Sequence, residues 1–302
     1  MRHILPILAI FLAFGCGQQE TTPSKPRIIK IVAVNHPLAM FASQVGRERV
    51  EVTMPVPEGI DPREWQPTPD EIAKIQKADL ILLNGAGYAK WAQTASLPAD
   101  RLVVASNPRR DDWIQLENMI THSHGPGGEH AHPEFAPHLW LDPLIAINMA
   151  DSVGSALSEQ MPEYQDDFRS NFALLRRYIM EESARLEVAV NTNRELPVIF
   201  ASPTYQYLER YYHMNGRNVD WSPDQSPDPF EWASFDNLLK EHPAKWMIWK
   251  SEPIPEIADR LRELGVESVV FDPAADKPAK GDLIDAMRRG ADTLNTVYDY
   301  EE

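Results

Sequence analysis

The chain has 302 residues, of which 45 are acidic and 29 are Lys or Arg, so its formal net charge is −16. This acidity argues against nucleic acid as a partner, because nucleic-acid binding needs Lys and Arg to neutralise phosphates. Cys16 is the only cysteine, so the region beyond it can form no disulfide and offers no thiolate to a metal.

Residues 1–27 are typical of an exported lipoprotein precursor. A charged start precedes an apolar run at 4–14 that is too short to span a bilayer. Cys16 then follows a small residue, which resembles the lipidation site of bacterial lipoproteins. We expect a lipoprotein signal peptide at 1–16, lipidation at Cys16 and a flexible tether at 17–27, with secretion alone as the alternative. The predicted location is the cell envelope, where the lipid-anchored protein faces the periplasm or the extracellular side.

Apolar runs alternate with helical segments in the next part of the chain. We predict strands at 28–34, 50–52, within 78–87 and at 102–105, and helices at 38–45 and 69–77. Such alternation favours βαβ units with a parallel sheet.

One long amphipathic helix is predicted over residues 162–191, because apolar residues recur there every three to four positions. At 1.5 Å per residue it would be about 45 Å long. Beyond it we predict strands at 198–201, 246–249 and 269–271, and helices at 255–264 and 282–297.

These elements predict an α/β protein of two βα lobes with parallel sheets, joined by one long rigid helix, with a cleft between the lobes. The expected bounds are 28–160 for the N-terminal lobe, 161–192 for the bridging helix and 193–302 for the C-terminal lobe. A ligand is expected between the lobes, at the carboxyl ends of the strands. The alternative is that the long helix packs inside a single domain.

Five of the nine histidines fall between positions 122 and 138. The tract around the first four is rich in His, Gly and Pro, so it cannot pack a core and is predicted to be a loop. Several neutral imidazoles close together suit Zn²⁺, and the four candidate ligands are His122, His124, His130 and His132. The alternative is a solvated loop with incidental histidines.

Four polar residues follow apolar strands or stand in turns: His36, Ser202, Glu252 and Asp272. Each one alone also fits an ordinary turn or helix cap. Their common position, at the edge that faces the other lobe, makes them candidate site residues.

Four tryptophans are expected to pack the lobes and the walls of the cleft rather than to stack on a ligand: Trp65, Trp140, Trp246 and Trp249.

Five segments of the chain carry a family resemblance, and they lie at 59–69, 78–91, 137–143, 251–253 and 271–273. In this order they resemble the motifs of the zinc/manganese solute-binding proteins of bacterial ABC importers, the cluster called A-I. The resemblance covers nearly the whole chain beyond the tether. It implies two βα lobes bridged by a rigid helix, with one metal ion in the cleft.

The four positions that correspond to the family's metal ligands are Arg63, His138, Ser202 and Asp272. Only His138 and Asp272 are metal ligands in kind. Ser202 is a weak ligand, and Arg63 stays protonated and repels Zn²⁺. Two ligands do not fill a tetrahedral zinc site.

Three interpretations remain open. In the first, zinc still binds at His138 and Asp272, with His36 or histidines of the loop recruited and Arg63 turned outward. In the second, Arg63 pairs with Asp272, and the degenerate site holds a non-metal anion or nothing. In the third, the His-rich loop collects or passes on zinc, as a scavenger or chaperone.

A zinc hydrolase is the alternative from another class, with Glu64 or Glu252 as the base and Arg63 as an oxyanion partner. No His-Glu-x-x-His pair or nucleophile elbow accompanies these residues. We therefore expect a binding protein, not an enzyme, that captures Zn²⁺, with Mn²⁺ as the alternative. The expected partner is the ABC permease of a metal importer, and the expected state is a monomer.

Overall fold

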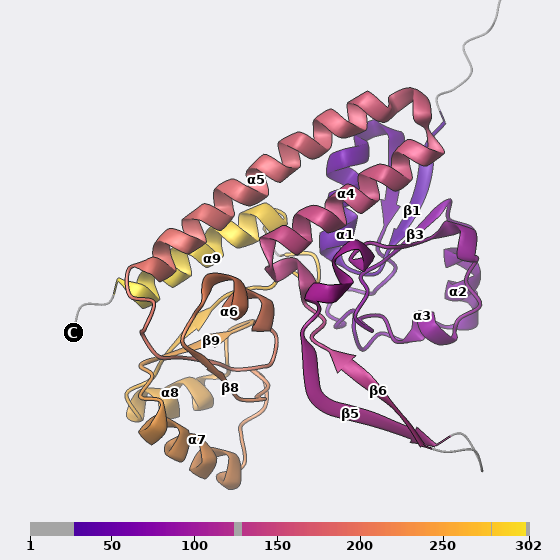
Figure 1. Ribbon diagram of the computed structural model, residues 1–302. Helices are drawn as coiled ribbons and strands as arrows, with labels where there is room; N and C mark the ends of the chain where they lie inside the picture. Colours follow the sequence, from indigo (N-terminus) through magenta and orange to yellow (C-terminus); the bar gives the residue numbers. More distant parts are fainter. Residues whose placement is uncertain (1–26, 124–128, 279, 300–302) are drawn as a thin grey trace, which may run out of the picture.

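The computed structural model describes residues 27–123, 129–278 and 280–299, and within these residues it has two four-stranded parallel sheets (Figure 1). The first has the order β2-β1-β3-β4 and is built from β1 (Ile29–Ala33), β2 (Val50–Thr53), β3 (Leu80–Leu83) and β4 (Leu102–Val104). The second has the order β10-β9-β7-β8 and is built from β7 (Val198–Phe200), β8 (Gly216–Asn218), β9 (Trp246–Trp249) and β10 (Glu267–Val270). The predicted α/β architecture with two parallel sheets is confirmed.

Three of the central strands, β3, β7 and β9, are apolar along their whole length, because helices or loops cover both faces of each sheet. All residues of β7 and β9 are buried, and so are three of the four residues of β3. The four tryptophans that were expected to pack the lobes are all buried, which confirms that prediction.

The first sheet is accompanied by α1 (His36–Gly46), α2 (Pro69–Ile75), α3 (Trp91–Thr94) and α4 (Pro143–Gln160), and by the 3₁₀ turns η1 (Arg47–Arg49), η2 (Ala99–Arg101), η3 (Asn107–Asp112) and η5 (Leu139–Leu141). The second sheet is accompanied by α6 (Gln206–Tyr212), α7 (Pro229–Glu241), α8 (Pro255–Glu263) and α9 (Leu283–Tyr298). No helix among the described residues is long and apolar enough to cross a membrane. The predicted signal peptide and Cys16 lie outside the described residues.

The long helix α5 (Gln165–Asn191) runs along both lobes (Figure 1). It packs on α1 and α4 of the first lobe and on α6 and α9 of the second. Its buried carboxylate, Glu182, accepts hydrogen bonds of 3.0 and 2.7 Å from Arg288 of α9. The predicted bridging helix is therefore present. It starts at Gln165 rather than at residue 162, because the residues before it form a separate 3₁₀ turn, η6 (Pro162–Tyr164).

The His-rich tract is not the loop that its composition predicts. It forms an antiparallel hairpin of β5 (Gln115–Ser123) and β6 (Glu129–Phe135), in which His122 pairs with His130. A hairpin needs backbone hydrogen bonds rather than a buried side-chain face, and its base is held where Phe135 packs edge-on against Trp113 at 5.4 Å. The hairpin extends away from α5 (Figure 1), and His124 lies outside the described residues.

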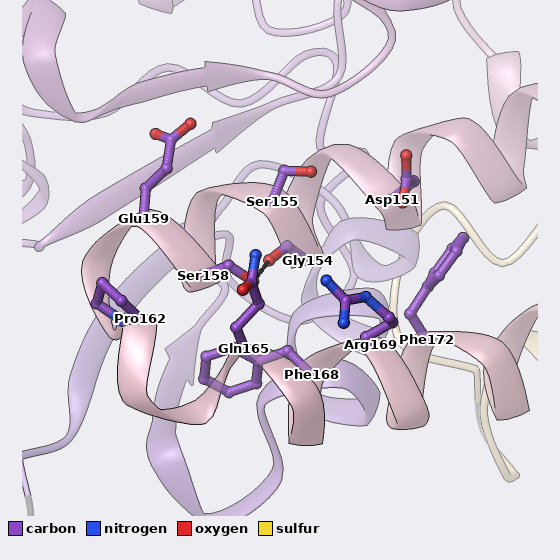
Figure 2. Close-up of a pocket in the computed structure, with 10 residues that line it drawn as sticks. All are labelled: Asp151, Gly154, Ser155, Ser158, Glu159, Pro162, Gln165, Phe168, Arg169 and Phe172. Carbon is purple, nitrogen blue, oxygen red and sulfur yellow. Dashed lines mark hydrogen bonds between the residues drawn. The ribbon is translucent and has the colours of Figure 1, made fainter.

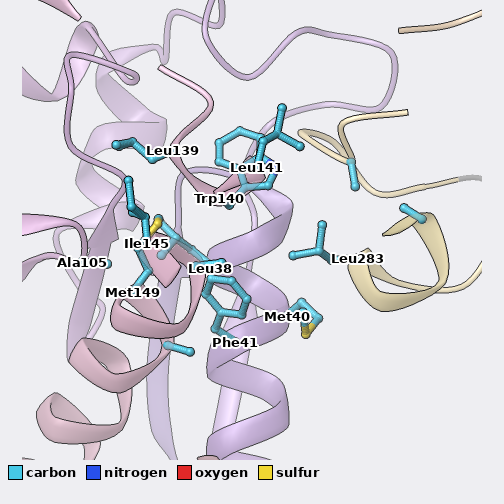
Figure 3. Close-up of a cluster of buried hydrophobic side chains, with 14 of the residues drawn as sticks. Leu38, Met40, Phe41, Ala105, Leu139, Trp140, Leu141, Ile145, Met149 and Leu283 are labelled. Atoms are coloured by element: carbon cyan, nitrogen blue, oxygen red, sulfur yellow. The ribbon is translucent and has the colours of Figure 1, made fainter. Parts of the chain in front are cut away.

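A buried apolar cluster joins the two lobes where α1 meets α4 (Figure 3). Leu38 and Phe41 of α1 lie beside Ile145 and Met149 of α4, and Leu283 at the start of α9 reaches toward them. This core fixes the position of η5, which directly follows His138.

Candidate functional site

The strand orders place a topological switch point in each sheet. In the first sheet the chain passes from β1 to β2 on one side of β1 and later returns to β3 on the other side. In the second sheet it passes from β7 to β8 on one side of β7 and later returns to β9 on the other side. Ligands of open parallel sheets bind outside the carboxyl ends of the strands at such points. Asn35 and Asn84 stand there in the first lobe, and Ser202 and Lys250 stand there in the second.

A buried amide network fixes the first of these edges. The side-chain nitrogen of Asn35 donates to the side-chain oxygen of Asn84 at 3.0 Å. The side-chain nitrogen of Asn84 in turn donates to the carbonyl of Pro137 at 3.0 Å, and Ser106 Oγ donates to the Asn84 carbonyl at 2.6 Å. Pro137 and its neighbour His138 are thus tied to the ends of β1, β3 and β4.

His138 is 5% exposed, and its Nδ1 atom has no hydrogen-bond partner. Its ring packs edge-on against Trp140 and Tyr88, with centroids 5.2 and 6.2 Å away. Burial, together with the charges of Arg63 and Lys250, lowers the pKa of His138 to about 3. The imidazole is therefore neutral and keeps a nitrogen lone pair for a ligand.

Tyr88 is a further candidate site residue, which the sequence interpretation did not select. It is 2% exposed, and its hydroxyl has no hydrogen-bond partner. Burial raises its pKa well above the ordinary value, so the group is a protonated donor. A tight turn places it, since Gly85 has φ +91° and a Cβ atom there would collide with Ser106 and Trp113.

Residues 61–65 form a loop that carries Arg63, whose charge acts on both His138 and Tyr88. Asp61 accepts from the backbone N–H of Arg63 at 3.0 Å, and its carboxylate lies 4.0 Å from Lys250 Nζ of the other lobe. Trp65 is buried edge-on against Trp91 at 5.7 Å. Among the contacts of the described residues no ion pair joins Arg63 to Asp272, so the structure does not support that part of the second interpretation.

His36 begins α1 and lies near Ala275 and three aspartates of the second lobe. Its backbone N–H donates to Ala275 O at 3.1 Å, and its Nε2 atom is buried without a partner. Burial lowers its pKa from 6.5, although three aspartates act in the opposite direction, namely Asp282, Asp276 and Asp272.

Asp272 is half-buried, and one of its oxygens accepts from the N–H of Ala274 at 2.8 Å. Ala274 has φ +53°, and the preceding Pro273 accepts a 2.7 Å hydrogen bond from Trp140 Nε1 of the first lobe. The second lobe is thereby docked beside His138. We call the region formed by His36, residues 61–65, Tyr88, His138, Lys250 and residues 272–276 the junction.

The remaining predicted residues contribute less. Ser202 exchanges a 2.9 Å hydrogen bond with Thr204, and Glu64 and Glu252 are exposed. Within the described parts of the chain no three His, Cys, Asp or Glu side chains lie close enough together to hold a metal ion. The junction therefore offers two free imidazole nitrogens but lacks a complete tetrahedral shell for zinc.

A surface cavity of about 370 Å³ lies apart from the junction, between α4 and α5 (Figure 2). Asp151, Glu159, Arg169 and Phe172 are among the side chains that line it, and none of the predicted site residues does so. The cavity is therefore not part of the predicted site.

Comparison with known proteins gives one family. The family model described as "Zinc-uptake complex component A periplasmic" matches residues 31–297. The zinc-binding lipoprotein AdcA of Streptococcus pneumoniae (strain ATCC BAA-255 / R6) is 24% identical over 306 residues, which cover 98% of this chain and 60% of that protein. The high-affinity zinc uptake system protein ZnuA of Bacillus subtilis (strain 168) is 25% identical over 304 residues, which cover 95% of this chain and 94% of that protein. The chain thus spans about 60% of the length of its streptococcal relative.

Solved structures share the fold. The metal-dependent lipoprotein YcdH from Bacillus subtilis has a TM-score of 0.76 at 22% identity, covering 89% of this chain and 98% of that chain. The Zn(II)-bound ZnuA-like domain of AdcA from Streptococcus pneumoniae has a TM-score of 0.75 at 21% identity, covering 90% and 100%. At these identities the likeness establishes the two-lobed architecture with its long helix.

Proposed function

Since the chain belongs to the family of periplasmic zinc-uptake complex component A proteins, we propose that it is the substrate-binding component of a metal ABC importer. It captures Zn²⁺ outside the cytoplasm, with Mn²⁺ as a weaker alternative, and delivers the ion to a permease. In this proposal Cys16 carries the lipid anchor and the protein is a monomer. Lobes at 28–160 and 193–302 flank the bridging segment 161–192.

The observation that carries the proposal is a pair of buried imidazole nitrogens without partners, His138 Nδ1 and His36 Nε2. A buried polar atom without a partner is costly, so it calls for an explanation such as a bound ion, ligand or ordered water. Both histidines have a lowered pKa, so each is in the neutral form that ligates zinc. Nitrogen ligands favour zinc over manganese, which suits carboxylate-rich sites better.

His138 is the central ligand in this account, and Asp272 and His36 are the next candidates. Further ligand atoms come from outside this set, because the described residues hold no complete group of three. The hairpin histidines His122, His130 and His132 are one source, together with His124. Exposed Glu64 and Glu252 leave the hydrolase alternative without a positioned base, so the proposed role is capture and delivery without catalysis.

Zinc collection by the hairpin itself is the second candidate function. The backbone register supports it, because His122 lies directly opposite His130 and the next alternate position is His132 opposite Ile120.

Calorimetric zinc titration of the full chain tests the proposal. His138→Gln is expected to lower the affinity by about 100-fold or more, because a lost direct ligand costs at least as much as the 10–100-fold typical of its supporting groups. His242→Gln is the matched control, since His242 is equally buried but bonds Val198 O in the second lobe. A hairpin variant with all four histidines changed to Ser is expected to keep one-to-one binding.

The opposite pattern would move the function to the hairpin. Zinc binding that is lost with the four hairpin histidines and is unchanged in His138→Gln would contradict capture at the junction. Thermal unfolding of each variant, measured without zinc, shows whether the fold is preserved.

A further inference from the structure

We propose that Arg210 and Tyr207 of α6 are positioning residues for the zinc site, because they hold the two ends of the segment that carries His138. This inference rests on the proposed function, in which His138 is the central ligand. It adds two side chains of the second lobe that act on this ligand through its own stretch of chain. We call residues 136–142 the His138 segment.

The last residue of the His138 segment is held by a direct contact from the second lobe. Arg210 Nη2 donates to Asp142 Oδ2 at 3.0 Å, and the side chain of Asp142 is 9% exposed. The other carboxylate oxygen of Asp142 accepts from the backbone N–H groups of Leu144 and Ile145, at 2.9 and 3.2 Å. One carboxylate therefore joins α6 to the first turn of α4 and to the end of the segment.

The first residue of the segment is held through the base of the hairpin. Tyr207 is fully buried, and its hydroxyl accepts from the backbone N–H of Ile114 at 3.0 Å. The carbonyl of Ile114 in turn accepts from the backbone N–H of Ala136 at 2.9 Å. A chain of two hydrogen bonds therefore links α6 to the start of the His138 segment.

The two side chains of α6 lie together, and Arg210 contacts both stretches of chain. Its guanidinium carbon is 5.0 Å from the centroid of the Tyr207 ring. Its Nη1 atom donates to the carbonyl of Asp112 at 2.7 Å, two residues before Ile114. The planar, forked set of donors of arginine suits two acceptors in different directions, whereas lysine presents a single charged nitrogen.

The middle of the His138 segment is fixed as well. The side-chain nitrogen of Asn84 donates to the carbonyl of Pro137, η5 packs on α6, and Trp140 Nε1 donates to the carbonyl of Pro273. Metal ligands need a fixed orientation, and the groups that orient them typically change metal affinity by about 10–100-fold. Release of either end of the segment is therefore expected to loosen the His138 ring.

The rate of zinc dissociation from the full chain, measured by transfer of the ion to a chelator, tests the inference. Arg210→Met and Tyr207→Phe are each expected to release zinc about tenfold faster than the unchanged protein, the lower end of the effect of orienting groups. The association rate should change little, because differences in affinity arise mostly from dissociation. Arg210→Lys is expected to restore part of the loss, since its single nitrogen can satisfy one of the two acceptors.

Two variants serve as matched controls. Tyr212→Phe also removes a buried hydroxyl from α6, but this hydroxyl donates to Ser183 Oγ of α5 at 2.9 Å. Arg262→Met removes an arginine of the second lobe that pairs with Asp259 of the same helix at 2.8 Å. Both controls are expected to release zinc at the rate of the unchanged protein. Thermal unfolding without zinc measures the stability of each variant separately.

A second measurement detects the position of the ring itself and needs no zinc. The imidazole nitrogen resonances of His138 can be identified in protein labelled with ¹⁵N-histidine by their absence in His138→Gln. They are expected to shift or broaden in Arg210→Met and Tyr207→Phe and to stay unchanged in both controls. The resonances of His242, which is hydrogen-bonded to Val198 O, should be the same in all these proteins.

Failure of this inference is distinguishable from failure of the proposed function. Unchanged zinc release and unchanged His138 resonances in both α6 variants would overturn the inference and leave zinc capture intact. Equally fast release in the controls would assign the effect to stability and would also overturn it. A lack of zinc binding in the unchanged protein would overturn the proposed function, whereas altered His138 resonances in the α6 variants would still support the positioning.

Discussion

His138 combines burial with an unpaired ring nitrogen, and this combination has consequences for pH dependence. Its pKa is lowered to about 3 in the folded protein from an ordinary value of 6.5. Neutral imidazole is thus favoured by the fold, so the stability linked to His138 is complete above pH 6.5 and is lost as the pH falls below it.

We predict that the free energy of unfolding falls more steeply between pH 6.5 and pH 4 in the unchanged protein than in His138→Gln. The difference in slope should approach 1.4 kcal/mol per pH unit, the value for one proton taken up on unfolding. Urea unfolding at several pH values measures it. His213→Asn serves as control because His213 is exposed, and equal slopes in all three proteins would contradict a buried neutral His138.

The same lowering of pKa separates the two possible zinc sites. Zinc bound through His138 should remain bound at pH 5, because that imidazole takes up a proton only at much lower pH. Histidines with an ordinary pKa titrate near pH 6.5. Zinc release measured by a fluorescent indicator between pH 7 and 4 should therefore have its midpoint below pH 5, and a midpoint near 6.5 would assign the zinc to histidines with an ordinary pKa.

At the scale of single residues, the sequence selected His138, Asp272 and His36 as candidates, and it did not select Tyr88, Asp61 or Lys250, which the structure places in the same junction. The rule that polar residues at strand ends form sites selected Glu252, which is exposed, although Lys250 immediately follows the predicted strand at 246–249. Tyr88 lies three residues beyond Gly85, and nothing in a single sequence shows that a turn carries an aromatic hydroxyl into the junction. The roles of the predicted ligands remain predictions.

The elements of the fold place these residues, and the turn after β3 restricts the backbone most strongly, because it requires glycine at position 85. Gly85→Ala is predicted to destabilise the protein by about 2 kcal/mol, because φ is +91° and the added methyl group collides with Ser106 and Trp113. Zinc affinity should fall as well, since Tyr88 and His138 move with this turn. Chemical unfolding and zinc titration measure the two effects.

Gly265→Ala is the matched control for this prediction. Gly265 also has a positive φ, of +78°, but no atom lies within 4 Å of the added methyl group. The control should lose about 1 kcal/mol of stability and keep its zinc affinity. Equal losses in both variants would show that backbone strain alone matters at Gly85.

Strands and long amphipathic helices could be predicted because their apolar periodicity follows directly from burial. The β9 segment was predicted with its observed bounds, and α5 within three residues at its start. Helices α4, α6 and α7 were not predicted. The hairpin was missed because its strands carry His and Glu without a clear alternation of apolar and polar residues, and their pairing is through the backbone.

On the scale of the whole molecule, α5 restrains the movement of the lobes. It packs on helices of both, and its buried Glu182 is bonded to α9. Zinc exchange should therefore need only small adjustments of the junction. Small-angle scattering with and without zinc is expected to show a change in radius of gyration below about 1 Å, the scale of movement in pre-organised complexes. A larger closure would contradict a rigid α5.

The two-lobed arrangement was predictable because parallel βα units before and after one long helix leave few alternatives. The contacts across the junction were not, since they depend on turns such as that at Ala274 and on single hydrogen bonds such as Trp140 to Pro273. These features decide which side chains meet, and they leave no periodic signal in the sequence.

Zinc K-edge X-ray absorption on the zinc-loaded full chain tests the central claim, that the ion is held at the junction by His138, most directly. The spectrum of the unchanged protein should contain imidazole nitrogen scatterers together with oxygen, and His138→Gln should lose one imidazole. The variant with four hairpin histidines changed should keep the His138 contribution. A zinc spectrum that is identical in His138→Gln and that changes only when the hairpin histidines are replaced would contradict the account.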